Sequence, residues 1–375
     1  MIFKNYKGLE LSALGLGLMR LPTVDGDNAK IDEVKTAEIV KYAMDNGINY
    51  FDTAWGYHGG QSEIVLGEAL KAHERSSFYL ADKFPGYDLQ NFTKAEEIFE
   101  KQLQKCQVEY FDFYLLHCLT DSNIEAYLNK EYGVVAYFLE QKRKGRIGHL
   151  GFSTHASLNN LQRFLQAYAN DLEFGQIQLN WLDWDLQNAK AQAELLQSYH
   201  LPIWVMEPVR GGVLAQVSKE NEEKLKAMRA NASVVEWAFR FVQSVDGVTV
   251  TLSGMSNMQQ LQDNIATFQT DEPLNDREKQ ALLDMATQLK EQTVPCTGCR
   301  YCTSYCPMEL NIPSLIRLYN EDTYSGGAVA AKSIEKLADN KKPSACVACR
   351  ACEKVCPQNI KISNMMSSFA ERLQK

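Results

Sequence analysis

Eight cysteines near the end of the 375-residue chain carry the clearest chemical signal in the sequence. They form two copies of the pattern C-x2-C-x2-C-x3-C-P, offset by fifty positions. The copies comprise Cys296, Cys299, Cys302 and Cys306, and then Cys346, Cys349, Cys352 and Cys356. Thiolates are soft ligands, and three evenly spaced cysteines with a fourth before proline are typical of iron–sulfur clusters. Structural zinc is the alternative, because two C-x2-C pairs can also bind it.

Four polar side chains in the first third of the chain indicate a second kind of chemistry. Asp52, Tyr57, Lys83 and His117 end or follow short apolar runs. A tyrosine hydroxyl has an unperturbed pKa of about 10, but an adjacent ammonium stabilises the phenolate and lowers that pKa. Lys83, held by Asp52, could serve Tyr57 in this way, with His117 bonded to the same substrate oxygen. Together they would form a proton donor for a carbonyl that receives a hydride, although each residue taken singly would more often be structural.

The elements that position these four residues alternate between strands and helices. Apolar residues at helical spacing, as in 33–46, 62–72 and 186–199, separate eight short predicted strands. The strands are 13–19, 48–53, 78–83, 111–117, 149–153, 174–179, 203–206 and 248–252. Eight βα repeats predict an α/β fold, the (β/α)8 TIM barrel, whose active site lies at the C-terminal ends of the strands. An open doubly wound sheet competes, but no G-x-G-x-x-G opens a helix after a strand.

The segment 51–67 resembles the signature of the aldo-keto reductase family. Its Phe-Asp-Thr-Ala start, the Ser62-Glu63 pair and the Leu66-Gly67 pair carry the likeness. The opening 8–17 also resembles the family's N-terminal hairpin and first strand, and the similarity extends from about Phe3 to Phe268. The resemblance implies a barrel, a nicotinamide cofactor that is usually NADPH, and catalytic roles for Asp52, Tyr57, Lys83 and His117.

The same resemblance implies which residues bind NADP(H) or NAD(H). Ser153 and Gln176 match the strand ends that hold the nicotinamide carboxamide, and Arg210 with Gly211 could meet the pyrophosphate. A loop and the helix start after it match the segment that receives the adenosine phosphates. That segment contributes Ser253, Gly254, Ser256, Asn257, Gln260, Asp263 and Asn264. Free backbone N–H groups and the helix dipole attract anions at such a site, whereas an ordinary βα turn is the alternative.

Two departures from the family pattern leave the choice between NADPH and NADH open. Met206 stands where many members carry an aromatic ring that stacks on the nicotinamide. Asn257 stands where a lysine or arginine often contacts the 2′-phosphate.

The tail resembles a dicluster ferredoxin-type domain, and the whole chain resembles the ferredoxin-tailed branch of the aldo-keto reductases. The likeness implies two [4Fe–4S] clusters, with the fourth cysteine of each pattern serving the other cluster. The first set would be Cys296, Cys299, Cys302 and Cys356, and the second Cys346, Cys349, Cys352 and Cys306. We expect the barrel over 1–270, a connecting helix over 271–294 and a small, mainly α-helical domain over 295–375. Asn275 and Glu278 form a capping-box pattern at the start of the connecting helix.

Composition limits the class of protein. A formal net charge of −8 leaves no cationic surface of the kind that nucleic-acid binding needs. No apolar stretch approaches the ~18 residues of a membrane span, and the start does not read as a secretory signal. Ten cysteines, most with metal-type spacing, fit a reducing compartment, so we expect a cytoplasmic protein.

Three hypotheses combine the two halves. A hydride carries two electrons and a [4Fe–4S] centre passes one, so the halves need an intermediary such as a flavin, for which the sequence shows no signature. We expect an oxidoreductase that reduces a small-molecule aldehyde or ketone with NAD(P)H, with Tyr57 as proton donor and the clusters exchanging electrons with a partner protein. In the second hypothesis the clusters only stabilise a lid. In the third, the chain is an electron-transfer or redox-sensing protein whose barrel binds nucleotide with little or no turnover.

Overall fold

A computed structural model describes residues 1–291, 293–294, 296, 302–325, 328–356 and 358–374. The chain divides into two compact units. The first comprises Met1–Gly211 with Lys226–Lys279, and the second comprises Gly212–Leu225 with Gln280–Lys375.

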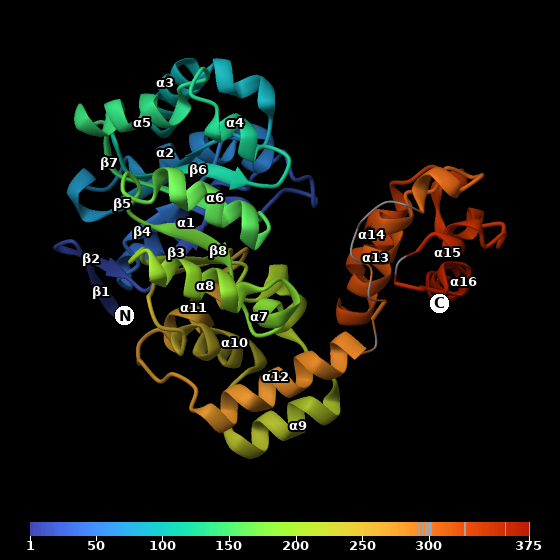
Figure 1. Cartoon of the computed structure of the whole chain (residues 1–375). Helices are drawn as coiled ribbons and strands as arrows, with labels where there is room; N and C mark the ends of the chain where they lie inside the picture. The colour runs from blue at the N-terminus through green and yellow to red at the C-terminus, as the bar shows by residue number, and fades with distance from the viewer. Residues whose placement is uncertain (292, 295, 297–301, 326–327, 357, 375) are drawn as a thin grey trace. The chain divides into compact units, whose positions relative to one another are not determined.

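Eight parallel strands close into a barrel in the first unit, which confirms the predicted fold class (Figure 1). In chain order they are β3 (Leu14–Gly17), β4 (Tyr50–Asp52), β5 (Tyr79–Phe84), β6 (Phe111–Leu119), β7 (Ile147–Thr154), β8 (Gly175–Gln178), β9 (Ile203–Met206) and β10 (Val248–Ser253). Each overlaps a strand predicted from the sequence. The ring closes because β10 pairs with β3 as well as with β9.

An antiparallel hairpin, β1 (Phe3–Tyr6) and β2 (Leu9–Ser12), precedes the barrel. Its Tyr6 and Leu11 are buried in one cluster with Phe113 and Trp204 of the strands. The rings of Tyr6 and Trp204 meet edge to face at 5.1 Å between centroids. The hairpin therefore adds apolar side chains to the barrel core.

Helices alternate with the strands, as the periodicity predicts. They are α1 (Glu33–Asp45), α2 (Ser62–Leu70), α3 (Ala95–Cys106), α4 (Ile124–Leu128), α5 (Val134–Arg143), α6 (Leu158–Tyr168), α7 (Asp183–Leu186), α8 (Ala189–Ser198), α9 (Lys219–Met228), α10 (Val234–Gln243) and α11 (Met258–Thr267). Gly47 and Gly145, just past the caps of α1 and α5, have φ of 91° and 77°. Glycine suits these two turns because it adopts positive φ without a Cβ clash.

The capping box predicted for the connecting helix is present at α12 (Asp276–Glu291). The Asn275 amide oxygen accepts from the Glu278 N–H at 3.0 Å, and the Glu278 carboxylate accepts from the Asn275 N–H at 2.9 Å. Arg229 donates to the same carboxylate at 2.7 Å. These bonds fix the start of α12 within the first unit.

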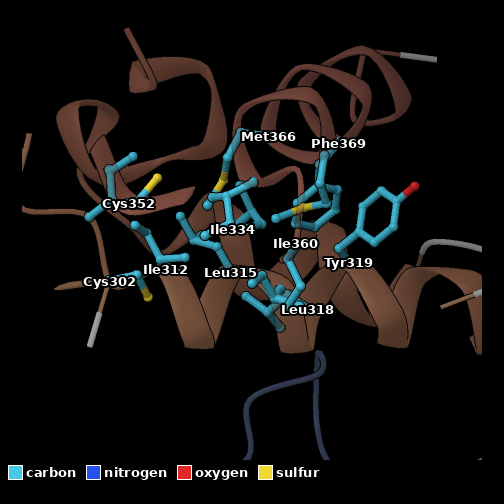
Figure 2. Packing of buried hydrophobic residues seen from close by; sticks show 14 of the residues in the cluster. Cys302, Ile312, Leu315, Leu318, Tyr319, Ile334, Cys352, Ile360, Met366 and Phe369 are labelled. Atoms are coloured by element: carbon cyan, nitrogen blue, oxygen red, sulfur yellow. The ribbon is translucent and has the colours of Figure 1, made fainter. Parts of the chain in front are cut away.

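The second unit is mainly helical beyond α12. Its helices are α13 (Ile312–Ser325), α14 (Ala328–Glu335), α15 (Ala351–Lys354) and α16 (Ile362–Arg372). Figure 2 shows that Ile312, Leu315, Met366 and Phe369 pack between α13 and α16. Cys302 and Cys352 belong to the same buried cluster, at 7% exposure each. Cys296, Cys306, Cys346 and Cys356 pack against this cluster, so six of the motif cysteines contribute to this core.

Within the described part of the chain, no helix has the length and apolar character that crossing a membrane requires.

Candidate active site and metal centre

Three neighbouring strands of the barrel carry three of the four predicted catalytic side chains. Asp52 ends β4, Lys83 lies near the end of β5, and His117 lies near the end of β6. Tyr57 follows β4 in a short 3₁₀ turn, Tyr57–Gly60. The C-terminal ends of parallel strands share one rim of a barrel, so the fold brings the four residues together.

Lys83 is the centre of this group. Its ammonium donates to the Asp52 carboxylate and to the Thr53 carbonyl, both at 2.6 Å, and its side chain is fully buried. The Lys83 nitrogen lies 5.0 Å from the centre of the Tyr57 ring. Burial lowers the pKa of Lys83, but Asp52 and Tyr57 raise it by more, so the ammonium stays charged.

The pKa of Tyr57 moves opposite to the sequence-based expectation. Burial raises it, and although Lys83 lowers it as expected, the net direction is upward. The physical reason is that the phenolate would lose more hydration than the ammonium returns. Tyr57 therefore retains its proton across the neutral range.

His117 is flanked by two tyrosine rings. Tyr57 and Tyr87 meet its imidazole edge to face, with centroids 6.1 and 5.5 Å away. Its Nδ1 is buried and has no hydrogen-bond partner among the residues that the structure describes. Burial and then the charge of Lys83 hold the pKa of His117 well below its usual range, so the ring is neutral. Tyr87 lies in the loop after β5, where no distinctive motif marks it in the sequence.

The loop that carries Tyr57 is anchored at two points that the sequence analysis missed. The Lys105 ammonium donates to Glu63 at 2.7 Å and to the Gly60 carbonyl at 3.2 Å, and it lies 4.1 Å from the centre of a Trp55 ring. On the other side, His58 accepts from the Leu21 N–H at 3.1 Å. These contacts fix the backbone on both sides of Tyr57.

The two residues predicted for the nicotinamide carboxamide lie side by side. Ser153 of β7 and Gln176 of β8 are partners in the strand register, and both are buried. Ser153 Oγ accepts from the Cys118 N–H at 2.9 Å, and Gln176 Nε2 lies 3.7 Å from Met206 Sδ. Gln176 Oε1 has no partner within the described residues. A buried acceptor of this kind suits the N–H donor of a ligand amide.

The predicted phosphate loop ends in a capped helix. Asn257 Oδ1 accepts from the Gln260 N–H at 3.0 Å and so caps α11. The Ser256 N–H donates to Gln260 Oε1 at 2.9 Å, and Asn264 Nδ2 donates to Ser253 Oγ at 3.2 Å. Asp263 instead accepts from Gln259 on the helix surface at 2.9 Å. The structure brings these residues together, with Asn257 as a cap in place of a cation.

Arg20, which the sequence analysis did not select, joins the two predicted cofactor segments. A Cβ added to Gly254 would lie 3.0 Å from Arg20 Cβ, and one added to Gly211 would lie 2.6 Å from an Arg20 guanidinium nitrogen. Arg20 pairs with Glu207 at 3.3 Å. Arg210 contacts Asp183, with Nε 3.1 Å from the carboxylate. The position of Arg20, just after the first barrel strand, is the signal that could have identified it.

Four cysteines in the second unit line a single cavity. They are Cys306, Cys346, Cys349 and Cys352, the set expected for the second cluster. Most of the remaining lining is apolar, including Met308, Leu310, Ile312 and Met366. Four soft thiol ligands in an apolar pocket suit an iron–sulfur cluster. Across the described ranges, no group of three or more His, Cys, Asp or Glu could hold a single metal ion.

The cysteines expected for the first cluster are described only in part. Cys302 is buried, and Cys296 and Cys356 pack against the same apolar core. Cys299 lies outside the described residues. Figure 2 shows Cys302 and Cys352 on the same side of the core.

Comparisons with known families match both units of the sequence. The model of the aldo/keto reductase family matches residues 13–284, and that of the 4Fe-4S dicluster domain matches residues 295–360. A probable aldo-keto reductase of Glycine max is 28% identical over 165 residues, which are 42% of this chain and 45% of that relative. The alignment therefore spans less than half of the soybean protein. The NADH-specific methylglyoxal reductase of Escherichia coli is 22% identical over 325 residues, 75% of this chain and 97% of the relative.

Solved structures show the same barrel. The holo form of aldo-keto reductase AKR11C1 from Bacillus halodurans is 26% identical, with a TM-score of 0.60 over 74% of this chain and 93% of that one. An aldo-keto reductase from Klebsiella pneumoniae, in complex with NADPH, is 19% identical with a TM-score of 0.61, over 76% and 96% of the chains. At that identity the second likeness shows the fold alone. The chain belongs to the aldo/keto reductase family and is an NAD(P)H-dependent oxidoreductase with a 4Fe–4S dicluster domain.

Proposed function

We propose that this protein reduces an aldehyde or ketone by hydride transfer, with Tyr57 as the proton donor. The observation that carries the proposal is the Lys83 ammonium, which is fully buried, 2.6 Å from Asp52 and 5.0 Å from the centre of the Tyr57 ring. A charge removed from water at this position is costly unless it serves a partner. Asp52 balances this charge before reaction, and during reaction the charge also stabilises the phenolate that forms when Tyr57 gives up its proton.

The four side chains divide the task of proton donation. NAD(P)H, when bound, supplies the hydride. Tyr57 keeps its proton before reaction because burial raises its pKa. As the substrate oxygen becomes negative, Tyr57 donates, and Lys83 stabilises the phenolate left behind. Asp52 fixes the ammonium, and neutral His117 offers one N–H to orient the carbonyl oxygen.

We propose that the cofactor binds at the same C-terminal rim of the barrel as the four catalytic side chains. We assign Ser153 and Gln176 to the carboxamide, because Gln176 Oε1 is a buried acceptor without a partner among the described residues. We assign Ser253, Gly254, Ser256, Asn257, Gln260 and Asn264 to the adenosine phosphates, with Arg210 and Gly211 near the pyrophosphate. Arg20 is added because its guanidinium reaches Gly211. Asp263 takes part only through the surface of α11.

The tail would supply one-electron exchange. We propose two [4Fe–4S] clusters with the crossed ligand sets given above, and the cavity shared by Cys306 with Cys346, Cys349 and Cys352 supports the second set. We also propose the division into 1–270, 271–294 and 295–375. A one-electron carrier protein would be the partner.

The test of the reductase is Tyr57→Phe with Tyr87→Phe as its control. The assay follows NAD(P)H oxidation with a panel of aldehydes and ketones that includes methylglyoxal. Loss of the proton donor is expected to lower kcat by about 10²- to 10⁴-fold, with unchanged nucleotide affinity. Tyr87→Phe keeps its ring and is expected to retain activity. Unchanged turnover in Tyr57→Phe would refute the assignment of Tyr57.

A second measurement tests the link between the two halves. Anaerobic holoprotein is mixed with NADPH or NADH while the visible absorbance of the clusters is followed. Bleaching would show that nicotinamide electrons reach the iron. Nucleotide binding without carbonyl turnover by the wild type would instead favour an electron-transfer or redox-sensing protein.

A further inference from the structure

We infer that the surface around the second cysteine motif docks an acidic one-electron carrier protein. The inference rests on the proposed role of the clusters and names the partner's chemistry and its site. The docking surface comprises Val347, Cys349, Arg350, Lys354 and Lys361.

The motif lies open on one side of its cavity. Cys349 lines the cavity and is exposed, and Val347 lines it with 59% of its surface exposed. Val347 and Cys349 belong to the short exposed stretch 347–350, just before α15. An electron carrier that covers this stretch approaches the proposed second cluster more closely than one held elsewhere on the unit. The exposed Val347 at the start of this stretch is an apolar contact point for such a partner.

Positive charge surrounds this opening although the protein as a whole is acidic. Residues 339–361 hold five basic and two acidic side chains, whereas the formal net charge of the chain is −8. Two of the five are already paired, Lys341 with Glu309 at 3.2 Å and Lys342 with Asp339 at 2.7 Å. Arg350, Lys354 and Lys361 are exposed, and none forms a salt bridge with a residue that the structure describes, although Arg350 and Lys361 act electrostatically on the carboxylate of Glu353.

The fold places these three cations near the junction between α15 and α16. Arg350 precedes α15 and Lys354 ends it, while Lys361 precedes α16. The two helices are joined where Glu353 accepts from the Ser363 N–H at 2.9 Å. The three cations therefore flank the same helix junction, and Arg350 also lines the cavity.

An acidic protein is the partner that this surface fits. Complementary charge steers two proteins together and raises their association rate, with a steep dependence on salt. Basic side chains beside an apolar contact are consistent with the usual arrangement of a polar rim next to a hydrophobic centre. One electron then passes between the carrier and the cluster, so that one is oxidised as the other is reduced by a single equivalent.

The experiment measures binding of flavodoxin, an acidic one-electron carrier, to anaerobic holoprotein without nucleotide or carbonyl. The Arg350→Glu/Lys361→Glu variant is expected to weaken binding at low salt by about 10-fold or more and to reduce its salt dependence. Lys332→Glu/Lys336→Glu has the same change in charge at exposed positions that do not line the cavity. This control is expected to retain wild-type affinity. Val347→Ser should weaken binding by about tenfold at all salt concentrations.

Iron content equal to that of the wild type verifies that each variant is folded and loaded. An equal loss in both charge variants, or binding that is insensitive to salt, would overturn the docking surface. Equally tight binding of duplex DNA would also overturn it, because the surface would then attract any polyanion. Docking that persists while NAD(P)H fails to bleach the clusters would overturn the proposed link between the two halves and leave the docking surface standing.

Discussion

The buried ion pair between Lys83 and Asp52 makes the sharpest prediction. The perturbation is Lys83→Met, which keeps the length of the side chain and removes its charge. Both side chains are nearly or fully inaccessible, and their charged atoms are 2.6 Å apart. At an effective dielectric constant of about 20 this separation corresponds to about 6 kcal/mol of attraction, of which burial takes back a part.

Removal of one partner leaves a buried carboxylate without its cation. Burial already raises the pKa of Asp52 despite Lys83. Breaking such a pair typically costs about 3–5 kcal/mol, which lowers the melting temperature of a domain of this size by roughly 6–20 °C. The matched control is Lys41→Met, which breaks the exposed Lys41–Asp45 pair at the same 2.6 Å distance. Exposed pairs contribute little, so its melting temperature should stay unchanged.

The double variant Asp52→Asn/Lys83→Met separates stability from chemistry. It removes both charges, so most of the lost stability should return, apart from about 1 kcal/mol for the Thr53 carbonyl that loses its donor. Carbonyl reduction should remain at least about 10²-fold slower, because the Tyr57 phenolate lacks its cation. Thermal unfolding and steady-state kinetics of the wild type, Lys83→Met, Asp52→Asn and the double variant complete the cycle. A double variant with wild-type kcat would show that Lys83 is only structural.

Four further predictions concern other parts of the molecule. Gln176→Leu should weaken NAD(P)H binding by about tenfold in a fluorescence titration, because a buried hydrogen-bond acceptor is lost. An unchanged Kd would show that Gln176 does not contact the cofactor. Cys306→Ala, Cys349→Ala and the double variant of the two should each lower iron from about eight to about four per chain, while Cys106→Ala retains the full content. A double variant without iron would show that the two cysteines serve different clusters and would contradict the shared cavity. Because the pKa of His117 lies well below its usual range, the rate of carbonyl reduction should be independent of pH from about 6 to 8. A change in rate within that interval would show that the imidazole gains a proton there. Burial raises the pKa of Glu173, but hydrogen bonds from His149, Lys142 and Lys7 lower it overall. The ionised carboxylate therefore contributes to the free energy of unfolding above about pH 4.3, and this contribution is lost as the pH falls. Glu173→Gln should reduce the fall in the free energy of unfolding at acid pH, which denaturant titrations at several pH values would measure.

The sequence predicts those parts of the molecule whose signal is local. Each barrel strand is a short apolar run, and the capping box of α12 consists of Asn275 and Glu278, three positions apart in the sequence. The spacing of the cysteines also indicates iron–sulfur ligation without reference to distant segments. In the same way, Asp52, Lys83 and His117 are visible because each ends a strand, where a barrel gathers its side chains.

The missed residues depend on contacts between distant segments. Arg20 reaches Gly211 and Gly254, and Lys105 reaches Glu63 and Gly60, but nothing in the neighbouring sequence marks either cation. The pKa of Tyr57 shows the same limit. Spacing indicates that Lys83 is near, whereas the amount of water removed from the phenol is set by the packed structure.

The cavity shared by the two cysteine motifs sets an order for biosynthesis. Cys306 belongs to the first motif, yet it lines the cavity of Cys346, Cys349 and Cys352. That cavity cannot be complete on a ribosome-bound chain until residues through Met366, which also lines it, have emerged and α13 has folded between the motifs. Metal insertion at this site must therefore follow translation of both motifs, and a product truncated between them would deliver an incomplete thiol set to the assembly machinery.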